Sequence, residues 1–347
     1  MRILLASASS PNPFIGELAN ALSIRPEVDS VEQDLHRFWK NPKSADVVHI
    51  HWPRALFPGW DPENRDDLER LEQVLDAWDD QIVINTVHNL HAHYRDSEIY
   101  EELNRMVYDH VDGFVHMGQV SEGLFQNEYP ETKRNPHEVI PHGRYEVFDN
   151  GVSREEARRR LGLGQKSHVV LAFGALRHPE ELRLLMEGLR IFSEPKKKLV
   201  VAGRLAWANN KVHTGALRGY HSLRSIARPV QFYFGAIDND EVQYFLNACD
   251  QIVIPRKDIL NSGDVTLGFT FGRVVVGPKC GVVQEVLEET GNPVYDPESP
   301  ESLANALNEG VGLVKRGKGE QNRVYAEKFM DWGDIARKHI EFYKSVR

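Results

Sequence analysis

The chain has 347 residues and carries a formal net charge of −9 at pH 7, with an isoelectric point near 5.9. This acidic balance argues against a general nucleic-acid partner, because nucleic-acid-binding proteins present a basic face. Apolar residues make up 41% of the chain and aromatic residues 9%, which excludes a disordered chain. No apolar run approaches the roughly 20 residues needed to span a bilayer, and the run after Met1 is too short for a signal peptide.

The cysteines and histidines bear on compartment and on metals. Cys249 and Cys280 lie in apolar segments, which suits a reducing compartment, so we expect a cytoplasmic protein. The histidines are scattered without an HExxH motif or a Cys/His framework, so we expect no metal site. Asp238-Asn-Asp240 is interpreted as the start of a helix rather than as a metal-binding motif.

The first half of the chain alternates short apolar runs with amphipathic stretches. Residues Arg65–Trp78 form one such stretch, with apolar side chains at helical spacing. Short runs that are apolar on both faces, joined by helices, predict parallel sheets covered on both sides. The strands predicted here are Arg2–Ser7, Val47–Ile50, Gln81–Val87, Gly113–Met117 and Glu138–Pro141.

The pattern restarts after a break near residues 142–152. Ser153-Arg-Glu-Glu156 is a capping box, and the helix that it opens is predicted to end at Gly162. Apolar residues at helical spacing predict a final helix over Trp332–Tyr343. The strands predicted in this half are His168–Phe173, Lys198–Ala202, Val230–Phe234, Gln251–Ile254 and Val274–Gly277. Because a single core stops growing near about 250–300 residues, we expect two doubly wound α/β domains facing each other.

Residues 251–277 contain the most informative segment. A predicted strand ends at Pro255, and Asn261-Ser-Gly263 then opens a helix. The amino end of a helix offers free backbone N–H groups and the positive end of the dipole, so it could hold a diphosphate. The alternative is a plain helix cap made by Asn261 or Ser262.

Two arginines follow predicted strands of the second half. Arg177 comes shortly after Gly174, and Arg204 directly follows Gly203. Both should point from carboxyl strand ends toward the ligand, where a guanidinium can bind phosphate oxygens. The alternative for each is a surface ion pair.

The segment 251–277 resembles the donor-binding stretch of GT-B glycosyltransferases, especially family 4. Gly272-Arg-Val-Val-Val276 resembles the family's Gly-x-Pro-Val-Val strand, and Gly281-Val-Val-Gln-Glu285 its Gly-Gly-x-x-Glu turn. The resemblance covers nearly the whole chain, since further segments occur in the family's order. These segments are Ala45–Trp52, Thr86–Asn89, Val139–Gly143, Phe173–Arg177 and the last helix.

The resemblance implies a GT-B fold of two Rossmann-like, doubly wound α/β domains facing across a cleft. Residues 1–150 would bind the acceptor, and residues 151–330 would bind a nucleotide-sugar donor. Residues 331–347 would form a helix that returns to the first domain. The donor-binding residues that we expect are Arg177, Arg204, Asp258, Asn261, Ser262, Gly263 and Glu285, with Glu285 on the ribose.

The resemblance also assigns roles in the first domain. His88 would contact the transferred sugar, and its place after a strand suits a hydrogen-bond or proton donor. His93, in the loop after it, is the candidate base if the enzyme inverts configuration, whereas a retaining enzyme needs none in the usual family account. Trp52 and His116 are the candidate acceptor contacts.

The sequence departs from the family pattern at the donor site. Family 4 enzymes carry two glutamates eight positions apart, where this chain has Ile259 and Leu267. Asp258 and Asp264 lie nearby, at a spacing of six. Glu180 occupies the position of a family lysine that neutralises the diphosphate. These departures put the retaining stereochemistry in doubt.

The sequence therefore predicts a metal-independent hexosyltransferase without other cofactors. It would move sugar from a nucleotide-diphosphate sugar to a hydroxyl of a glycan, glycolipid or other acceptor in polysaccharide biosynthesis. Peripheral contact with the inner face of the membrane is a further expectation. Two alternatives stay open, a GT-B-like binding subunit without activity and a sugar-nucleotide 2-epimerase.

Overall fold

A computed structural model of the protein describes residues 1–7, 12–59, 61–62, 64–90, 98–207 and 229–346. The chain folds into two compact units. The first comprises Met1–Gly143 with Met330–Arg347, and the second comprises Arg144–Phe329. The first boundary thus falls at Gly143 rather than at residue 150.

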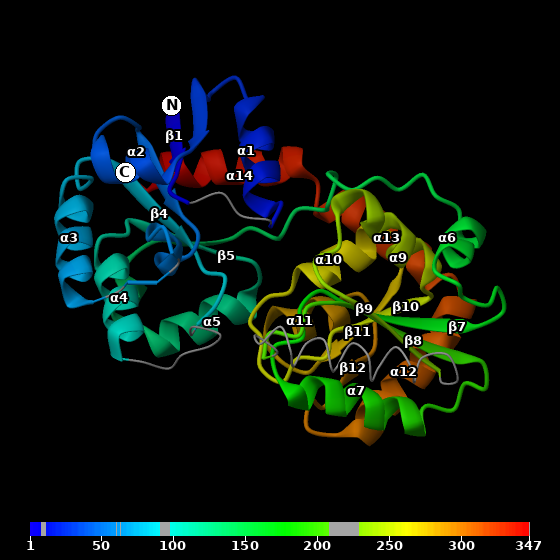
Figure 1. Cartoon of the computed structure of the whole chain (residues 1–347). Helices are drawn as coiled ribbons and strands as arrows, with labels where there is room; N and C mark the ends of the chain where they lie inside the picture. Colours follow the sequence, from blue (N-terminus) through cyan, green and yellow to red (C-terminus); the bar gives the residue numbers. More distant parts are fainter. Residues whose placement is uncertain (8–11, 60, 63, 91–97, 208–228, 347) are drawn as a thin grey trace. The chain divides into compact units, whose positions relative to one another are not determined.

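The first unit is built on a six-stranded parallel sheet (Figure 1). The sheet has the order β2-β1-β3-β4-β5-β6, so the chain changes direction between β1 and β3. The strands are β1 (Arg2–Leu5), β2 (Ser30–Gln33), β3 (Val47–Ile50), β4 (Ile82–Thr86), β5 (Gly113–His116) and β6 (His137–Val139). Every strand predicted for this half is present, while the half-buried edge strand β2 was missed.

Helices cover both faces of the first sheet. On one face α1 (Phe14–Ser23) and α14 (Trp332–Ser345) share a core with β1, β3, β4 and β5, and Figure 1 shows α14 in red beside α1 in blue. On the other face α4 (Glu98–Asp109) packs Tyr108 against Phe114 of β5, with 5.7 Å between ring centroids. The remaining helices are α2 (Leu35–Lys40), α3 (Arg65–Asp76), which packs on α4, α5 (Gln119–Glu128) and the short 3-10 turns Pro53–Leu56 and Pro130–Arg134.

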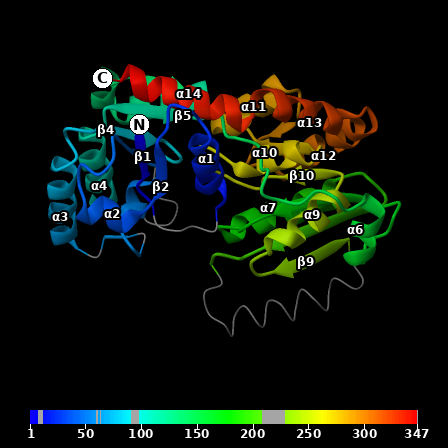
Figure 2. The same cartoon turned by 90° about the horizontal axis from the view of Figure 1, so that it is seen from above.

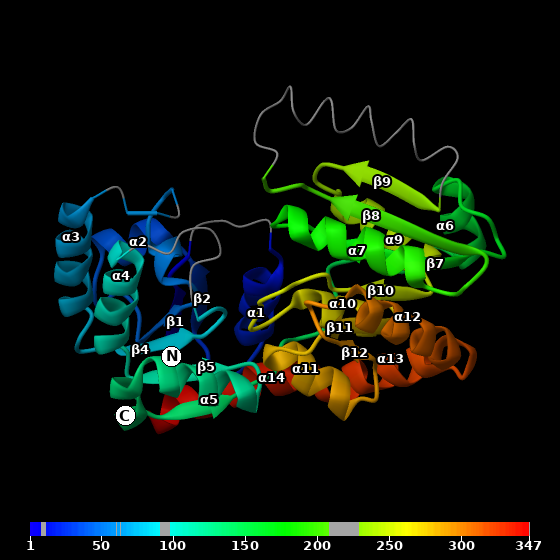
Figure 3. The same ribbon diagram turned by 90° about the horizontal axis from the view of Figure 1, so that it is seen from below.

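The second unit is built on another six-stranded parallel sheet (Figure 3). Its order is β12-β11-β10-β7-β8-β9, which is the Rossmann order, with the change of direction between β7 and β10. The strands are β7 (His168–Phe173), β8 (Lys197–Gly203), β9 (Val230–Phe234), β10 (Gln251–Val253), β11 (Val274–Pro278) and β12 (Val294–Tyr295). Two doubly wound α/β domains are therefore confirmed.

Alternate residues of β7 and β8 face opposite cores. Val170 and Val201 pack against α7 (Pro179–Ile191) and α12 (Pro300–Lys315), whereas Val169 and Val200 pack against α6 (Arg154–Arg160), α9 (Asn239–Ala248) and α10 (Gly263–Thr270). This alternation is the pattern that a strand buried on both faces requires. The remaining helices among the described residues of this unit are α11 (Gly281–Glu289) and α13 (Lys318–Phe329), and α13 packs on α10 (Figure 2).

The ends of α6 follow the sequence closely. The Ser153 hydroxyl accepts a hydrogen bond from the Glu156 amide at 3.2 Å, which is one of the two bonds of the predicted capping box and makes Ser153 the helix cap. Gly162 adopts a φ of +64°, and its amide and that of Leu163 bond back to the carbonyls of Arg159 and Arg158. A left-handed residue with these two bonds is a Schellman ending, which glycine adopts without strain.

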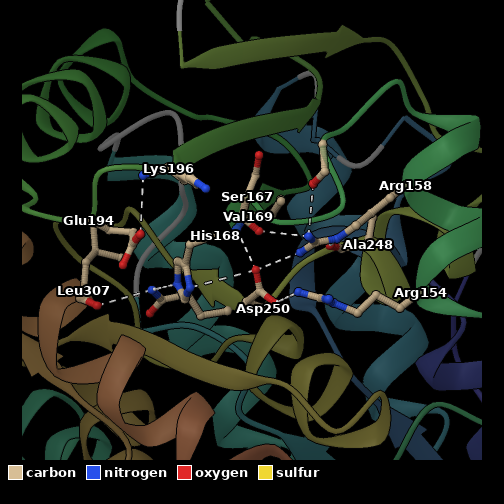
Figure 4. Close-up of polar contacts among 12 residues, drawn as sticks. Arg154, Arg158, Ser167, His168, Val169, Glu194, Lys196, Ala248, Asp250 and Leu307 are labelled. Carbon is tan, nitrogen blue, oxygen red and sulfur yellow. Dashed lines mark hydrogen bonds and ion pairs between the residues drawn. The ribbon is translucent and has the colours of Figure 1, made fainter.

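A buried ion pair lies at the amino ends of β7 and β10 (Figure 4). The Arg158 guanidinium is fully buried and lies 2.8 Å from the Asp250 carboxylate. Arg154 reaches the other oxygen of Asp250 at 2.6 Å, and the Val169 amide donates to Asp250 at 2.7 Å. Arg158 also donates to four carbonyls, those of Ala248, Gly164, Gln165 and Ser167. This network ties α6 to the loop before β7 and to the start of β10.

Candidate functional site

The second unit brings the predicted donor segments together at one edge of its sheet. In an open α/β sheet, ligands bind beyond the carboxyl ends of the strands where the strand order reverses. Here that point lies between β7 and β10, which pair directly. Arg177 follows β7, and the loop from Arg256 to Ser262 follows β10. Both segments therefore leave the sheet at neighbouring positions.

The amino end of α10 is formed by the predicted loop. Ser262 has extended backbone geometry, and its hydroxyl accepts from the Asp264 amide at 3.3 Å. Ser262 is thus the helix cap, and it satisfies one of the amides that a phosphate would use. A side chain on Gly263 would place its Cβ 2.4 Å from the Tyr145 hydroxyl. The backbone approaches Tyr145 this closely because residue 263 is glycine.

A second arginine, which sequence analysis did not single out, lies beside Arg177. Arg256 is 7% exposed and forms an ion pair with the buried Glu181 at 2.7 Å. It also donates to the Ala175 carbonyl at 2.5 Å. Glu181 in turn accepts from the Arg177 amide at 2.6 Å. Glu181 therefore fixes the Arg177 backbone and offsets the charge of Arg256. The sequence feature that could have revealed Arg256 is its position directly after Pro255, at the end of a predicted buried strand.

Electrostatics link the two arginines to the first turn of α10. Burial raises the pKa of the Asp264 carboxyl to about 6, while Arg256 and Arg177 act to lower it. Both cations therefore lie within electrostatic reach of this helix end. Glu181 offsets the charge of Arg256, so the charge of Arg177 is the one that adds to the positive end of the helix dipole and favours an anion there.

The carboxyl ends of β7 and β8 approach each other closely because Gly174 directly follows β7 and Gly203 ends β8. Gly203 has a φ of +150°, and a Cβ there would lie 1.8 Å from the Gly174 carbonyl oxygen. Leu176 and Leu205 continue the pairing as an isolated bridge. Arg204 consequently lies next to the Arg177 segment, and its side chain is exposed.

The other predicted donor residues differ in accessibility. Asp258 is exposed, and Asn261 is half-buried. Glu285 lies in the second turn of α11, whose cap residue is Cys280. Ile259 and Leu267 are 5% and 4% exposed, respectively. The two positions at which the family carries glutamates are therefore part of the core here.

In the first unit, histidines gather at the carboxyl ends of β3 and β4. His51 Nδ1 lies 3.1 Å from His88 Nε2. The Trp52 indole stacks on the His88 ring, with centroids 4.1 Å apart and an interplanar angle of 24°. Phe14 of α1 meets the same ring edge-on at 5.3 Å. The two predicted residues His88 and Trp52 are thus in direct contact.

The histidines of this cluster are held neutral at pH 7. Burial holds the pKa values of His49, His51 and His88 well below the usual range, and neighbouring histidines lower them further. Burial also lowers the pKa values of His142 and His339 to about 4. A neutral imidazole can still donate one hydrogen bond, but it adds no positive charge.

His116 does not fit the predicted acceptor contact. It is fully buried, and its ring nitrogens lie 3.1 Å from the Ser121 hydroxyl and 2.9 Å from His137 Nδ1. A side chain with both nitrogens engaged inside the unit has a structural role. His93, the candidate base, lies outside the described residues.

Two further findings concern metals and membranes. Within the described part of the chain, no group of three or more His, Cys, Asp or Glu side chains is placed to hold a metal ion. None of the described helices is both long and apolar enough to cross a membrane.

Comparison with solved structures defines the class of fold. The chain superposes on Anabaena HepE in complex with UDP and glucose with a TM-score of 0.73 and 15% identity, covering 99% of this chain and 100% of that one. Sucrose-phosphate synthase from Thermosynechococcus elongatus gives a TM-score of 0.74 at 15% identity, with 99% and 98% covered. These matches span both units, and the predicted GT-B fold is confirmed.

A curated relative matches nearly the full length of the chain. A GDP-mannose:glycolipid 4-beta-D-mannosyltransferase of Xanthomonas campestris pv. campestris is 22% identical over 348 aligned positions, covering 96% of this chain and 88% of the relative. No protein-family model matches the chain. The predicted glycosyltransferase class therefore agrees with the activity for which this relative is named.

Proposed function

We propose that the protein is a metal-independent glycosyltransferase that moves a hexosyl group from a nucleotide-diphosphate sugar to a hydroxyl of a glycan or glycolipid. The observation that carries this proposal is the amino end of α10, with Arg177 and Arg256 at the edge where the second sheet changes direction. A diphosphate is attracted by helix amides, by the helix dipole and by guanidinium groups. The activities of the relatives belong to the same class.

Arg177 is the expected main cationic ligand of the donor diphosphate. Arg256 is buried and already paired with Glu181, so its field acts at a distance. Arg177 is half-buried at the carboxyl end of β7. The amides of Ser262 and Gly263 would hold phosphate oxygens, with Asn261, Arg204 and Asp258 around them. Glu285 would accept from the ribose.

The chemistry that this site supports is loss of a nucleoside diphosphate. The bond between the anomeric carbon and the phosphate oxygen breaks, and its electron pair stays on that oxygen. The acceptor oxygen forms the new glycosidic bond, and its proton passes to a base of the first unit if the enzyme inverts configuration, or to the leaving phosphate oxygen if it retains configuration. Preorganised amides and Arg177 stabilise the charge that develops on the leaving phosphate, which is the main catalytic effect of such a site.

In the first unit, we propose that Trp52 offers an aromatic surface to the acceptor. His88 would contact the transferred sugar as a neutral hydrogen-bond donor, because its lowered pKa excludes the imidazolium at pH 7. Expected cytoplasmic location and peripheral membrane contact stay predictions of the sequence.

Calorimetric titration tests the donor site and names the donor class. GDP, UDP, GDP-mannose and UDP-glucose are each titrated with and without EDTA, because the curated relative is named for GDP-mannose and a solved neighbour contains UDP. We expect one nucleotide to bind, equally well with EDTA. Arg177→Ala should weaken its affinity roughly 10- to 100-fold, since a hydrogen bond to a charged group contributes about 1.5–3 kcal/mol. Arg183→Ala, on the exposed side of α7, is the matched control and should bind like wild type.

Three outcomes would contradict the proposal. If no nucleotide binds, the donor site is absent and the inactive subunit becomes the better explanation. If nucleotide affinity is the same in wild type and Arg177→Ala, the site lies elsewhere. If the sugar nucleotide is converted to its epimer without an acceptor, the protein is an epimerase.

A further inference from the structure

The residue before Trp52 has no role in the proposed function, yet it makes a polar contact with His88. His51 directly follows β3 and is 1% exposed. β3 and β4 are adjacent and parallel, so the residues that follow them emerge side by side. The 3.1 Å separation of His51 Nδ1 and His88 Nε2 is a normal hydrogen-bond distance.

Packing leaves the two rings little freedom. Trp52 stacks on one face of His88, and Phe14 meets its edge. His51 is stacked on His49, with centroids 4.3 Å apart and an interplanar angle of 28°. His49 is itself held by the Tyr343 hydroxyl at 2.7 Å and the Thr86 hydroxyl at 2.7 Å. The bond between His51 and His88 therefore joins two rings whose planes are already fixed.

The direction of this bond decides where each ring carries its proton. Both rings are neutral, so one of the two facing nitrogens must donate and the other accept. His51 Nε2 is buried and has no hydrogen-bond partner among the described residues. If His51 carried its proton on Nε2, that N–H would be a buried donor without a partner, which is rare in proteins. A proton on Nδ1 leaves only a lone pair at Nε2 and lets His51 donate to His88.

We propose that His51 is a positioning residue that donates from Nδ1 to Nε2 of His88 and thereby fixes the proton of His88 on Nδ1. His88 then donates through Nδ1, and its Nε2 is engaged and cannot act as a base. The tautomer follows from the contacts of the first unit alone. Its effect on turnover rests on the proposed function, in which His88 contacts the sugar.

The surroundings of the pair are consistent with two neutral rings. The titratable groups that act on them are His49 from β3, His142 from the segment after β6 and His339 from α14, while Tyr343 of α14 contacts His49 rather than the pair. The histidines among these disfavour a positive charge on their neighbours. Above pH 6.5 the pair should therefore keep one arrangement of protons.

Long-range proton–nitrogen NMR correlation on the full chain, with ¹⁵N-labelled histidine, tests the tautomer directly. We expect the His88 signals at pH 7.5 to show a protonated Nδ1 and an unprotonated Nε2, and His51 to be protonated on Nδ1. His88→Gln and His51→Phe assign the signals. A His88 protonated on Nε2, or a charged His88, would overturn the proposal.

Variants of His51 test whether it acts through His88. His51→Phe keeps a ring but cannot donate, so the His88 signals should move to a mixture of tautomers. Turnover should fall about tenfold or more in kcat, with KM for the donor nearly unchanged. His51→Asn places an amide N–H near the position of Nδ1 and should restore the His88 tautomer and most of kcat. Unchanged His88 signals in folded His51→Phe would refute the assignment.

A matched control breaks a similar bond elsewhere in the same sheet. His137→Phe removes the contact of 2.9 Å between His116 and His137 and should leave the His88 tautomer and turnover unchanged. The NMR measurement of the His88 tautomer requires no substrate, so it tests the inference even if no donor nucleotide is found. If the wild-type protein turns over a donor but His88 is protonated on Nε2, the inference is rejected and the proposed function still holds.

Discussion

At the scale of single residues, burial decides what a charged group contributes. Arg158 and Arg160 lie two positions apart on α6, and each pairs with a carboxylate. The Arg158 side chain is 0% exposed, whereas that of Arg160 is 61% exposed. The two ion pairs look equivalent in the sequence but should differ widely in their effect on stability.

We expect Arg158→Met to destabilise the second unit by roughly 3–5 kcal/mol, because it leaves the buried Asp250 carboxylate and several carbonyls short of donors. Arg160→Met removes an exposed pair that solvent screens and should leave the stability of the second unit nearly unchanged. Hydrogen exchange of the β7 and β10 amides in increasing urea measures both. Equal effects of the two substitutions would refute this assignment of the buried pair.

Gly263 offers a second test at this scale. An added methyl group would lie 2.4 Å from the Tyr145 hydroxyl oxygen, but 3.4 Å from the next Tyr145 atom, Cζ. Gly263→Ala should therefore cost about 1–3 kcal/mol through overpacking, although alanine favours helices more than glycine does. Tyr145→Phe in the same chain should recover most of that loss. A thermal double-mutant cycle measures the coupling, and simple additivity of the two changes would contradict the close contact.

At the scale of elements, the last helix, α14, packs into the hydrophobic core of the first unit. Its residue His339 is 2% exposed, and its Nδ1 lies 2.9 Å from the Ile335 carbonyl oxygen. Burial lowers the His339 pKa to about 4 from an unfolded value of 6.5. The unfolded chain thus binds the proton more tightly than the folded one between these two pH values.

The sign of the pH effect follows from this difference. Folding stability from His339 is fully present above pH 6.5 and is lost as pH falls from 6.5 to about 4, amounting to roughly 3 kcal/mol. We expect His339→Met to reduce the pH dependence of unfolding of the first unit by about that amount. Tryptophan fluorescence during urea unfolding at a series of pH values measures it. An unchanged slope would show that His339 titrates normally in the folded protein.

At the scale of the whole molecule, the two units should respond differently to the donor nucleotide. The proposed diphosphate ligands all belong to the second unit, Arg144–Phe329. A nucleotide at about 100 times its Kd should stabilise that unit by about 2.7 kcal/mol. Hydrogen exchange should slow in α10 and in the segments after β7 and β10, with and without EDTA. Protection confined to the first unit would contradict the assignment of the donor site.

Much of the fold was predictable because buried parallel strands are apolar on both faces. The bounds of β3, β7 and β9 match the prediction, and the other predicted strands are present with small shifts at their ends. The strands missed were β2 and the two-residue β12, which lie at the edges of their sheets. β2 has the sequence Ser-Val-Glu-Gln and β12 has only two residues, so neither forms an apolar run that the sequence pattern could reveal.

The candidate site was predictable only in part. Ser262 caps α10, which was the alternative to a phosphate contact of its side chain, and Arg177 follows β7 at the predicted edge. Sequence reasoning could not foresee that Glu181 pairs with Arg256, because the two are far apart in the chain. It also gave His116 an acceptor role that full burial excludes.

By itself, the sequence predicted the two doubly wound domains, the start of α10 and, through its resemblance to a known family, the glycosyltransferase class, because these depend on local periodicity, helix-end chemistry and ordered motifs. Tertiary structure decided which polar groups meet. His51 reaches His88, and Arg256 reaches Glu181, across neighbouring elements. Burial and hydrogen-bond partners set the charge and the proton position of each such group, and both depend on contacts between residues distant in the chain.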